Sequence, residues 1–399
     1  MTETGRPGET VPMRRGLPLM VLVALAAVYA AVAIGLCLVP VGEGIANRAG
    51  GVLGNDFLVF FSAADLVRSG AAAADIFDAA RLQAHQDALS GLGVHLPWAY
   101  PPHLLLLVRW MAALPYAAAL GLWLAATTLP FAVLARRATG AAWVLILLAP
   151  PVVQNAADGQ NGALTATLIL AGVTALAAGR SLLAGVAFGL LVYKPQVAVL
   201  APIALVAARD RRALVGFALG AAALPALSLA VDGWAPWRAF LAHLPDHFAL
   251  VVDGRLPRER FPTVFAAVLG ASGSAPAARV AQAVATIVAW AGVYWAWRRT
   301  DDPWLRLAAL CVAMPLATPF LLEYDLVIWA VPGLMLARSV WWGEASAADA
   351  GAMVLFLFTP PVIWMAGLAG WTLGAVPVVV LAAWTVRRIG SASAVGRAV

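Results

Sequence analysis

Long apolar runs separated by short polar segments dominate the sequence. Runs of about 17 to 25 residues, the length that crosses the hydrocarbon core of a bilayer as a helix, recur along almost the whole chain. Barrel strands would give short segments of alternating polarity instead, so the pattern predicts helices. The predicted spans, about twelve, lie near residues 17–39, 103–134, 141–154, 161–178, 182–193, 196–208, 213–231, 277–297, 304–318, 324–338, 350–367 and 372–386. The pattern therefore predicts an all-α polytopic membrane protein.

Composition points the same way. The 399 residues are 63% hydrophobic and only 12% charged, whereas a soluble domain carries about 25% charged residues. Lipid is therefore expected to surround most of the chain, and we expect it to reside in the inner or plasma membrane. Residues 17–388 are expected to form a single transmembrane domain, with tails at 1–16 and 389–399.

Arginines cluster between the apolar runs. With a cytoplasmic N-terminus, positive charges should recur after every second crossing. The clusters are Arg14 with Arg15, Arg136 with Arg137, Arg180, Arg209 with Arg211 and Arg212, Arg298 with Arg299, Arg338, and Arg387 with Arg388. This order predicts that both termini are cytoplasmic and that residues 41–101 and 232–275 form long extracytoplasmic loops. The net charge of +6 then reflects topology, and no basic patch for nucleic acid is indicated.

The two long loops differ in character. Residues 76–89 of the first loop have apolar positions at helical spacing, which predicts an interfacial helix. The second loop is rich in proline and tryptophan and is predicted to be irregular. His243 and His247 in this loop have a spacing of four, but Pro245 argues against a regular helix that presents both, so no metal site is expected.

Asp56, shortly after the first span, is the leading candidate for chemistry. A carboxylate at the membrane's outer edge can stay ionised while partly dry surroundings raise its pKa toward the range of a general base. The alternative is a helix N-cap or a first-turn acid. The sequence leaves both open.

Lys194 is the only lysine in the chain and lies at a break between two short spans, before Pro195. A desolvated amine at that place would attract a lipid phosphate. A lysine that extends to the interface, with no ligand, is the alternative.

Three further polar groups stand at predicted outer boundaries. Amides suit sugar hydroxyls because they both donate and accept, and buried acids are costly unless paired or used. The groups are Gln160 and Asn161 in one turn, Glu323, Tyr324 and Asp325 before a late span, and Tyr100 with His103 before the second span. No P-loop, Gly-x-Gly-x-x-Gly, Asp-x-Asp or His-Glu-x-x-His pattern is present, so a soluble nucleotide site has no support.

Several of these segments together resemble glycosyltransferase family 87, enzymes of the GT-C membrane superfamily that depend on polyprenol-phosphate sugars. The matching pieces are Asn55-Asp56-Phe57, Tyr100-Pro101-Pro102, Gly159-Gln160-Asn161, Ala184-Gly185 running to Lys194-Pro195, and Thr318-Pro319. The resemblance implies a GT-C-type bundle with a long first extracytoplasmic loop. It also implies inverting, metal-independent transfer without a cofactor, with Asp56 as the catalytic base.

Such a reaction assigns roles to the polar residues. The attacking hydroxyl needs a base and the departing lipid phosphate needs positive charge. Phosphate would be held by Lys194 and by Arg255, Arg258 or Arg260, and sugar contacts would come from Asn55, Tyr100, His103, Gln160, Asn161, Glu323, Tyr324 and Asp325. The partners would be a polyprenyl-phosphate sugar, a lipid or glycan acceptor, and membrane lipid. Mannosyltransferases of the family often place histidines where this chain has Tyr324 and Asp325, so a hexosyl group is expected without a choice of sugar.

A transporter or lipid flippase is the competing reading. In it Asp56, Lys194 and Asp325 would line a translocation path, with charges deep in the spans. The predicted span centres are almost free of charge and the polar motifs gather on one side. This distribution favours a one-sided enzyme.

Overall fold

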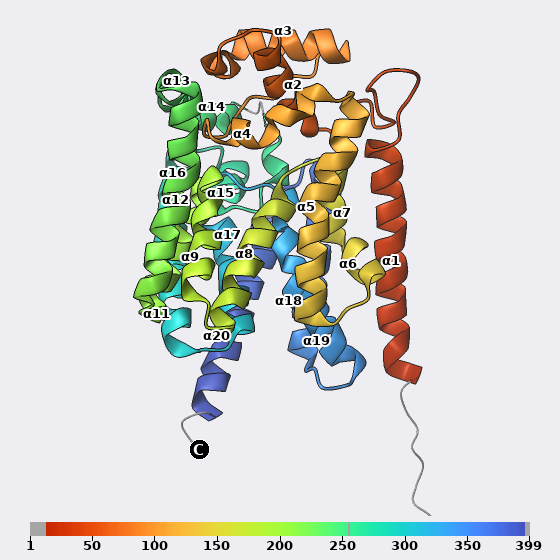
Figure 1. The fold of residues 1–399 in the computed structure, drawn as a ribbon. Helices are drawn as coiled ribbons and strands as arrows, with labels where there is room; N and C mark the ends of the chain where they lie inside the picture. Colours follow the sequence, from red (N-terminus) through yellow and green to blue (C-terminus); the bar gives the residue numbers. More distant parts are fainter. Residues whose placement is uncertain (1–12, 254–255, 396–399) are drawn as a thin grey trace, which may run out of the picture.

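The protein is a bundle of helices, seen here in a computed structural model that describes residues 13–253 and 256–395 (Figure 1). Two isolated β-bridges, Pro40 with Asn47 and Ala46 with Val52, are the extended pairings in these residues. The first half of the chain forms α1 (Met13–Cys37), α2 (Phe57–Arg68), η1 (Ala73–Phe77), α3 (Ala79–Ser90), α4 (Leu104–Val108), η2 (Arg109–Ala113), α5 (Tyr116–Thr139), α6 (Trp143–Leu147), α7 (Pro150–Ala157), α8 (Gly162–Ala177), α9 (Ser181–Gly189), η3 (Leu190–Tyr193), α10 (Pro195–Ala198) and α11 (Leu200–Ala208). The second half forms α12 (Arg211–Asp232), α13 (Ala235–His243), α14 (Asp246–Val252), η4 (Arg258–Arg260), α15 (Val264–Ser272), α16 (Ala275–Arg299), α17 (Pro303–Ala317), η5 (Glu323–Trp329), α18 (Ala330–Trp341), α19 (Ala347–Leu368) and α20 (Ala375–Val395).

The all-helical, multi-pass prediction is confirmed at this level. Six helices among the described residues are long and apolar enough to cross a membrane, within α1, α5, α12, α16, α19 and α20. Five shorter apolar segments accompany them, Leu104–Ala113, Gly162–Ala177, Ser181–Tyr193, Pro195–Ala208 and Pro303–Ala317. At 1.5 Å per residue, Ser181–Tyr193 reaches only about 20 Å. The count of about twelve spans therefore stays a prediction.

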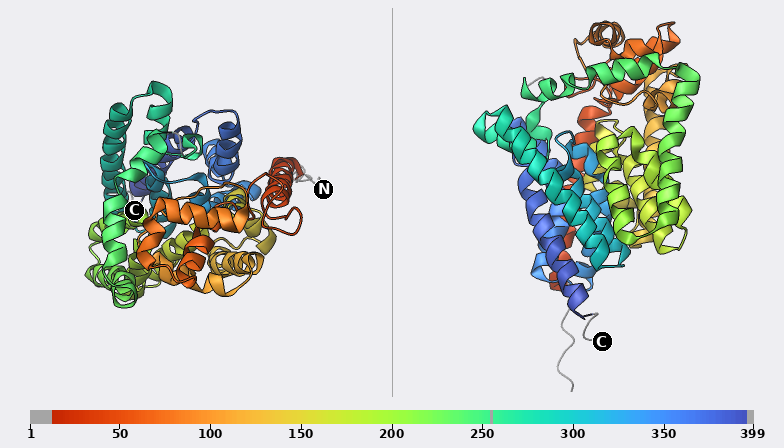
Figure 2. Two further views of the ribbon diagram at one scale, coloured as in Figure 1. Left: turned by 90° about the horizontal axis from the view of Figure 1, so that it is seen from above. Right: turned by 90° about the vertical axis from the view of Figure 1, so that its left-hand side faces the viewer.

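The bundle has two different ends. Helices α2, α3, α4, α13 and α14 gather at one end, which we call the loop end (Figures 1 and 2). The first described turn of α1 and the last turns of α20 lie at the other, which we call the terminal end. The first loop contains a helix where one was predicted, α3, and Asp78 caps it by accepting from the backbone N–H of Ala80 at 3.0 Å; its position at a membrane interface stays a prediction.

The predicted single span at 103–134 is wrong. The chain forms the short helices α4 and η2, turns at Leu114 in an extended conformation, and begins α5 only after Pro115. Proline disfavours helix in the residue before it and has no N–H to donate, so it suits a helix start. The membrane-length helix is therefore α5, and Arg109 lies outside it, paired with Asp232.

The second long loop is also not irregular as predicted, because it contains α13, α14 and α15. Its prolines stand where helices begin: Pro236 lies in the first turn of α13, and Pro245 occupies the N-cap position of α14. Proline at the first helical positions costs no hydrogen bond. Thr263 caps α15 through its side-chain oxygen, which accepts from Ala266 N at 3.3 Å.

Glycines bring α9 and α12 into backbone contact. Gly185 and Gly189 on one helix face Gly216 and Gly220 on the other. A Cβ at Gly216 would lie 2.2 Å from the carbonyl oxygen of Leu182. Small residues four apart allow this close approach, which is how helices pack in membranes.

We expect Gly216→Leu to destabilise the protein by about 1–3 kcal/mol, toward the upper end because the clash is with rigid backbone. Thermal unfolding in detergent would measure the change. Gly292→Leu in α16 is the matched control, since a Cβ there meets nothing within 4 Å. Equal stability of the two variants would contradict the packing argument.

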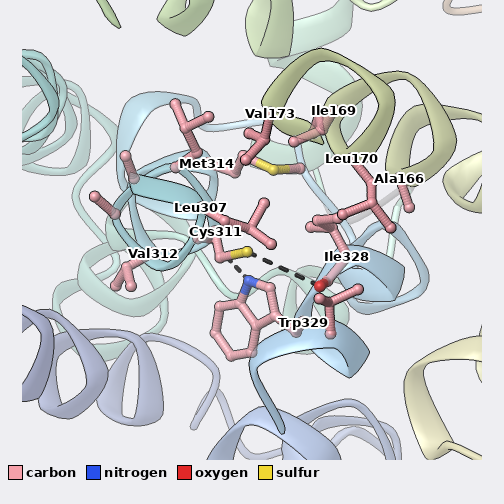
Figure 3. Packing of buried hydrophobic residues seen from close by; sticks show 14 of the residues in the cluster. Ala166, Ile169, Leu170, Val173, Leu307, Cys311, Val312, Met314, Ile328 and Trp329 are labelled. Carbon is pink, nitrogen blue, oxygen red and sulfur yellow. Dashed lines mark hydrogen bonds between the residues drawn. The ribbon is translucent and has the colours of Figure 1, made fainter. Parts of the chain in front are cut away.

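A buried core joins α8, α17 and η5 (Figure 3). The indole N–H of Trp329 donates to the carbonyl of Cys311 at 2.8 Å, which ties η5 to α17. Ile169 and Leu170 of α8 pack on the same cluster. This core fixes η5, whose first residues contribute to the candidate site.

Candidate active site

Four segments that are far apart in the sequence meet beside Asp56. The amide of Gln160 donates to Oδ2 of Asp56 at 3.1 Å and to the hydroxyl of Tyr324 at 3.3 Å. The hydroxyl of Tyr100 donates to Oε1 of Gln160 at 3.0 Å. One amide therefore joins the start of α2, the segment before α4, the turn between α7 and α8, and η5.

The turn that carries Asp56 is shaped by backbone that few residues adopt. Gly54 has φ of 66° and Asn55 has φ of 38°, both in the left-handed region, which glycine and asparagine tolerate best. A Cβ at Gly159 would lie 2.5 Å from Cβ of Phe57 and 2.7 Å from the Gly54 carbonyl oxygen. The two turns can therefore pack back to back only because position 159 is glycine.

Side-chain amides hold Asn55 in this unusual conformation. Its Nδ2 donates to Oδ1 of Asp158 at 3.0 Å, and its Oδ1 accepts from Nδ2 of the buried Asn47 at 3.0 Å. Gln154 also donates to Asp158, at 2.7 Å from Nε2 to Oδ2. Asn55 thus orients the turn, which places its neighbour Asp56.

Asp56 does not cap α2 through its side chain. It occupies the N-cap position of α2, but its side chain makes no capping hydrogen bond. Asp78 shows what a cap looks like in this chain, accepting from two backbone N–H groups at the start of α3. The carboxylate of Asp56 instead points to Gln160, which is outside its own helix.

Burial raises the pKa of Asp56 to about 6. The main cause is loss of hydration, and the nearby negative charge of Asp158 adds to it, while Arg260 and the amide of Gln160 oppose it. At neutral pH the carboxylate is then mostly ionised and also a stronger base than a hydrated aspartate.

Arg260 of η4 is clamped between two acids next to this turn. Its Nη2 lies 2.7 Å from Oδ2 of Asp158, and its Nε lies 2.6 Å from Oε1 of Glu323. Both acids are almost fully buried, whereas the arginine side chain keeps 20% of its surface exposed. Its Cζ also lies 5.7 Å from the ring centre of Tyr324. Burial by itself lowers the pKa of Arg260, but the nearby acids, chiefly Asp158 and Glu323, outweigh it and hold this pKa well above its ordinary range, so Arg260 stays charged.

Residues 98–319, more than half of the chain, match the sequence profile of glycosyltransferase family 87. The chain belongs to glycosyltransferase family 87. No curated protein and no solved structure matches it. Membership implies glycosyltransferase activity in a protein with several helices of membrane length, and the resemblance seen in the sequence is confirmed.

The family 87 match covers only part of the candidate site. Tyr100, Gln160 and Arg260 lie within it, whereas Asp56 precedes it and Tyr324 follows it. These residues are nevertheless in contact, because Gln160 bonds to both residues outside the match, Asp56 and Tyr324. The site is thus continuous in space across the boundaries of the matched region.

Lys194 has a partner in this family 87 chain. Its ammonium pairs with the carboxylate of Asp325, and both side chains are more than nine-tenths buried. The break before Pro195 places Lys194 at the junction of η3 and α10, as expected. Lys194 is therefore not a free cation awaiting a phosphate, and sequence reasoning did not anticipate its pairing with Asp325.

We expect Lys194→Met to lower the free energy of unfolding by about 3 kcal/mol, because it leaves a buried carboxylate without its cation. Adding Asp325→Asn should recover most of the loss, since no buried charge then remains. Unfolding of both variants in the same detergent would test this. If Lys194→Met were as stable as the parent, the ion pair of Lys194 with Asp325 would not stabilise the protein.

The other predicted residues are distributed around this centre. Asn161 is fully buried beside Tyr193, and neither polar atom of its side chain has a hydrogen-bond partner among the described residues. His103 is buried and stacks on Trp237 with ring centres 5.6 Å apart, outside the network of Gln160. Arg258 is partly exposed and pairs with Glu259 at 3.3 Å. Arg255 lies outside the described residues.

Sequence reasoning missed three members of the network. Asp158 accepts from Asn55, Gln154 and Arg260, although only Gln160 and Asn161 of its turn were predicted to belong to the site. Asn47 and Gln154 were not singled out at all. The available signal was the density of polar residues in Asp158-Gly159-Gln160-Asn161 within an apolar chain, because buried polar groups in a membrane protein need partners.

Proposed function

We propose that this protein transfers a hexosyl group from a polyprenyl-phosphate carrier to a lipid or glycan acceptor, at the extracytoplasmic face, with Asp56 as the general base. The observation that carries the proposal is the carboxylate of Asp56, which is free of a capping role and hydrogen-bonded to Gln160 where four segments meet. Family membership supplies the reaction class.

In the proposed step, residues of the site take up the proton of the acceptor and stabilise the negative charge of the departing phosphate. The acceptor hydroxyl gives its proton to Asp56 while its oxygen bonds to the anomeric carbon. The bond from that carbon to the phosphate oxygen breaks, and the electron pair leaves with the phosphate. Attack from the opposite side inverts the configuration, and no metal is needed where cations stabilise the departing charge.

Arg260 is the best-placed cation for that phosphate. Its Nε and Nη2 contact Glu323 and Asp158, which leaves Nη1 for a further acceptor. Arg258 lies two residues away on the same η4 segment. Lys194 would contribute only where the phosphate competes with Asp325. The sugar would lie among Asn55, Tyr100, His103, Gln160, Asn161, Glu323 and Tyr324.

The charged residues of the site carry an excess of negative charge, which opposes the binding of a phosphate donor. Asp56, Asp158, Glu323 and Asp325 are four acids, and Arg260 and Lys194 are two bases. With every group ionised, these six residues carry a net charge of −2. Burial raises the pKa of Glu323 to about 7, so proton uptake by Glu323, with Asp56 still ionised as the base, would help the site accept a phosphate.

The distribution of arginines supports the proposed sidedness. Arg338 of α18 bonds to the Thr139 carbonyl at the end of α5, and Arg298 of α16 bonds to the Ala207 carbonyl at the end of α11. These helix ends belong to the end of the bundle opposite α2 and α3 (Figure 1). By the positive-inside rule, these arginines support an extracytoplasmic position for the loop end, where Asp56 lies.

The donor is open to a direct test. We expect purified protein in nanodiscs to transfer sugar from a polyprenyl-phosphate hexose and to leave nucleotide sugars unused. The release of lipid phosphate and the glycosylated acceptor would both be measured. Efficient transfer from a nucleotide sugar without lipid carrier would overturn the donor assignment. Movement of the lipid-linked sugar across the bilayer without transfer would favour the flippase reading.

A further inference from the structure

A large apolar groove lies at the terminal end of the bundle, away from the candidate active site. It has a volume of about 720 Å³ and is lined by α1, by α18 and by the connection from α5 to α6. Small residues make it hollow, including Ala24 and Ala27 on α1 and Gly140 and Ala141 on the connection. Helix α1 stands at the edge of the bundle, so its flank borders the membrane (Figure 1).

Charge is distributed unequally around this groove. Arg338 is the one cation of its lining, and none of the lining residues in the described part of the chain is acidic. Arg136, which does not line the groove, donates to the carbonyl of the lining residue Ala141 at 3.1 Å. Trp341 and Trp342 complete the rim with 53% and 67% of their surfaces exposed, as tryptophans at the membrane interface do.

Arg338 is held at the mouth of the groove by the end of α5. Its Nη1 donates to the Thr139 carbonyl at 3.4 Å, and a Cβ at Gly140 would lie 3.0 Å from the same nitrogen. No carboxylate in residues 13–253 or 256–395 forms an ion pair with it. Because a guanidinium has five N–H donors, this fixed group can bind a phosphate bidentately.

The groove is separate from the site of Asp56. A smaller hollow of about 80 Å³ continues it along α1 toward Pro150. Above that point α1 closes on α7, where the hydroxyl of Tyr29 donates to Gln154 and Ala30 and Ala33 pack against Val153. A chain that enters from the terminal end therefore stops below the polar network.

We propose that this groove binds one anionic phospholipid from the membrane leaflet at the terminal end, with the phosphate on Arg338 and an acyl chain along α1. The cation without an acid selects for negative charge, and the apolar walls select for a chain. A free phosphate would use only the first feature, and a neutral lipid only the second. The proposal rests on the membrane location and does not depend on Asp56 or on the reaction.

Native mass spectrometry of the detergent-solubilised full chain would test this site. Phosphatidylglycerol would be titrated against phosphatidylcholine with the same chains. We expect one phosphatidylglycerol to bind preferentially, and Arg338→Gln to weaken it by about 10- to 100-fold, the loss for one charge-assisted hydrogen bond. Arg298→Gln is the matched control, because its side chain bonds to Ala207 outside the groove, and it should leave binding unchanged.

A second pair of variants tests the chain-binding part. Ala24→Phe fills the groove and should weaken binding without a change in charge, whereas Ala31→Phe, on an exposed face of α1 outside the lining, should not. Equal binding by the parent protein and Arg338→Gln, or no preference for the anionic lipid, would overturn the proposal. Effective competition by glycerol phosphate would also overturn it, since that result identifies an anion site without a chain. Binding should persist in Asp56→Asn, which separates this test from that of the proposed function.

Discussion

Asp56→Asn is expected to lower the rate of sugar transfer by about 10² to 10⁴, the usual cost of a lost general base. The substitution keeps the size of the side chain and its ability to accept from Gln160. The fold should therefore remain, because Asp56 makes no capping hydrogen bond that α2 would lose. Single-turnover transfer in nanodiscs would measure the loss, and thermal unfolding would check the fold.

Other acids of the same loop provide matched controls. Asp65 pairs with His85 at 3.0 Å, and Asp75 pairs with Arg81 at 2.8 Å. Their roles are therefore structural, so Asp65→Asn and Asp75→Asn should keep activity within a few-fold. Near-normal turnover in Asp56→Asn would remove this residue from the mechanism.

The pH dependence gives the same assignment a second test. A base acts only when ionised, and the pKa of Asp56 is raised to about 6. With saturating donor, so that binding does not limit the rate, transfer should therefore be nearly constant above about pH 7 and fall as the pH drops through 6. An acid limb near pH 4 would indicate a hydrated carboxylate instead.

Arg260→Gln is expected to lower the free energy of unfolding by about 4 kcal/mol. It removes the one cation that contacts both Asp158 and Glu323 among the described residues, and buried acids left without a partner are strongly destabilising. Activity should fall as well, because this arginine is the proposed phosphate ligand. Unfolding at several pH values and the apparent donor affinity would be measured.

The sign of the pH effect in this variant follows from Glu323. Burial raises its pKa and Arg260 opposes the rise, so removing the arginine raises it further. A protonated Glu323 carries no buried charge, and the stability deficit should therefore be smaller at pH 6 than at pH 8. Adding Glu323→Gln should likewise recover part of the loss.

Arg258→Gln is the matched control for Arg260→Gln. Arg258 is 41% exposed and pairs only at the surface with its neighbour Glu259, and such pairs contribute little. Its removal should change stability by less than about 0.5 kcal/mol. Equal losses of stability in the two variants would contradict a stabilising role for Arg260 between Asp158 and Glu323.

Hydropathy and local chemistry were enough for several parts of the structure. Apolar length predicted the helices of the bundle, and Asp56 was singled out by its place after the first span. Local signals failed where a helix boundary depended on context. Pro115 divided the expected second span, so that its membrane-length helix begins only at Tyr116, and Pro236 and Pro245 began helices in a loop predicted to be irregular.

The sequence by itself determined the helical membrane architecture and the family, because both follow from patterns read along the chain. Only the tertiary structure decided which charges meet. Arg260 reaches Asp158 across 102 residues, and Lys194 reaches Asp325 across 131. A buried charge in an apolar protein must find an opposite partner, but hydropathy does not say which one. Helix packing made that choice, and with it the surroundings of Asp56.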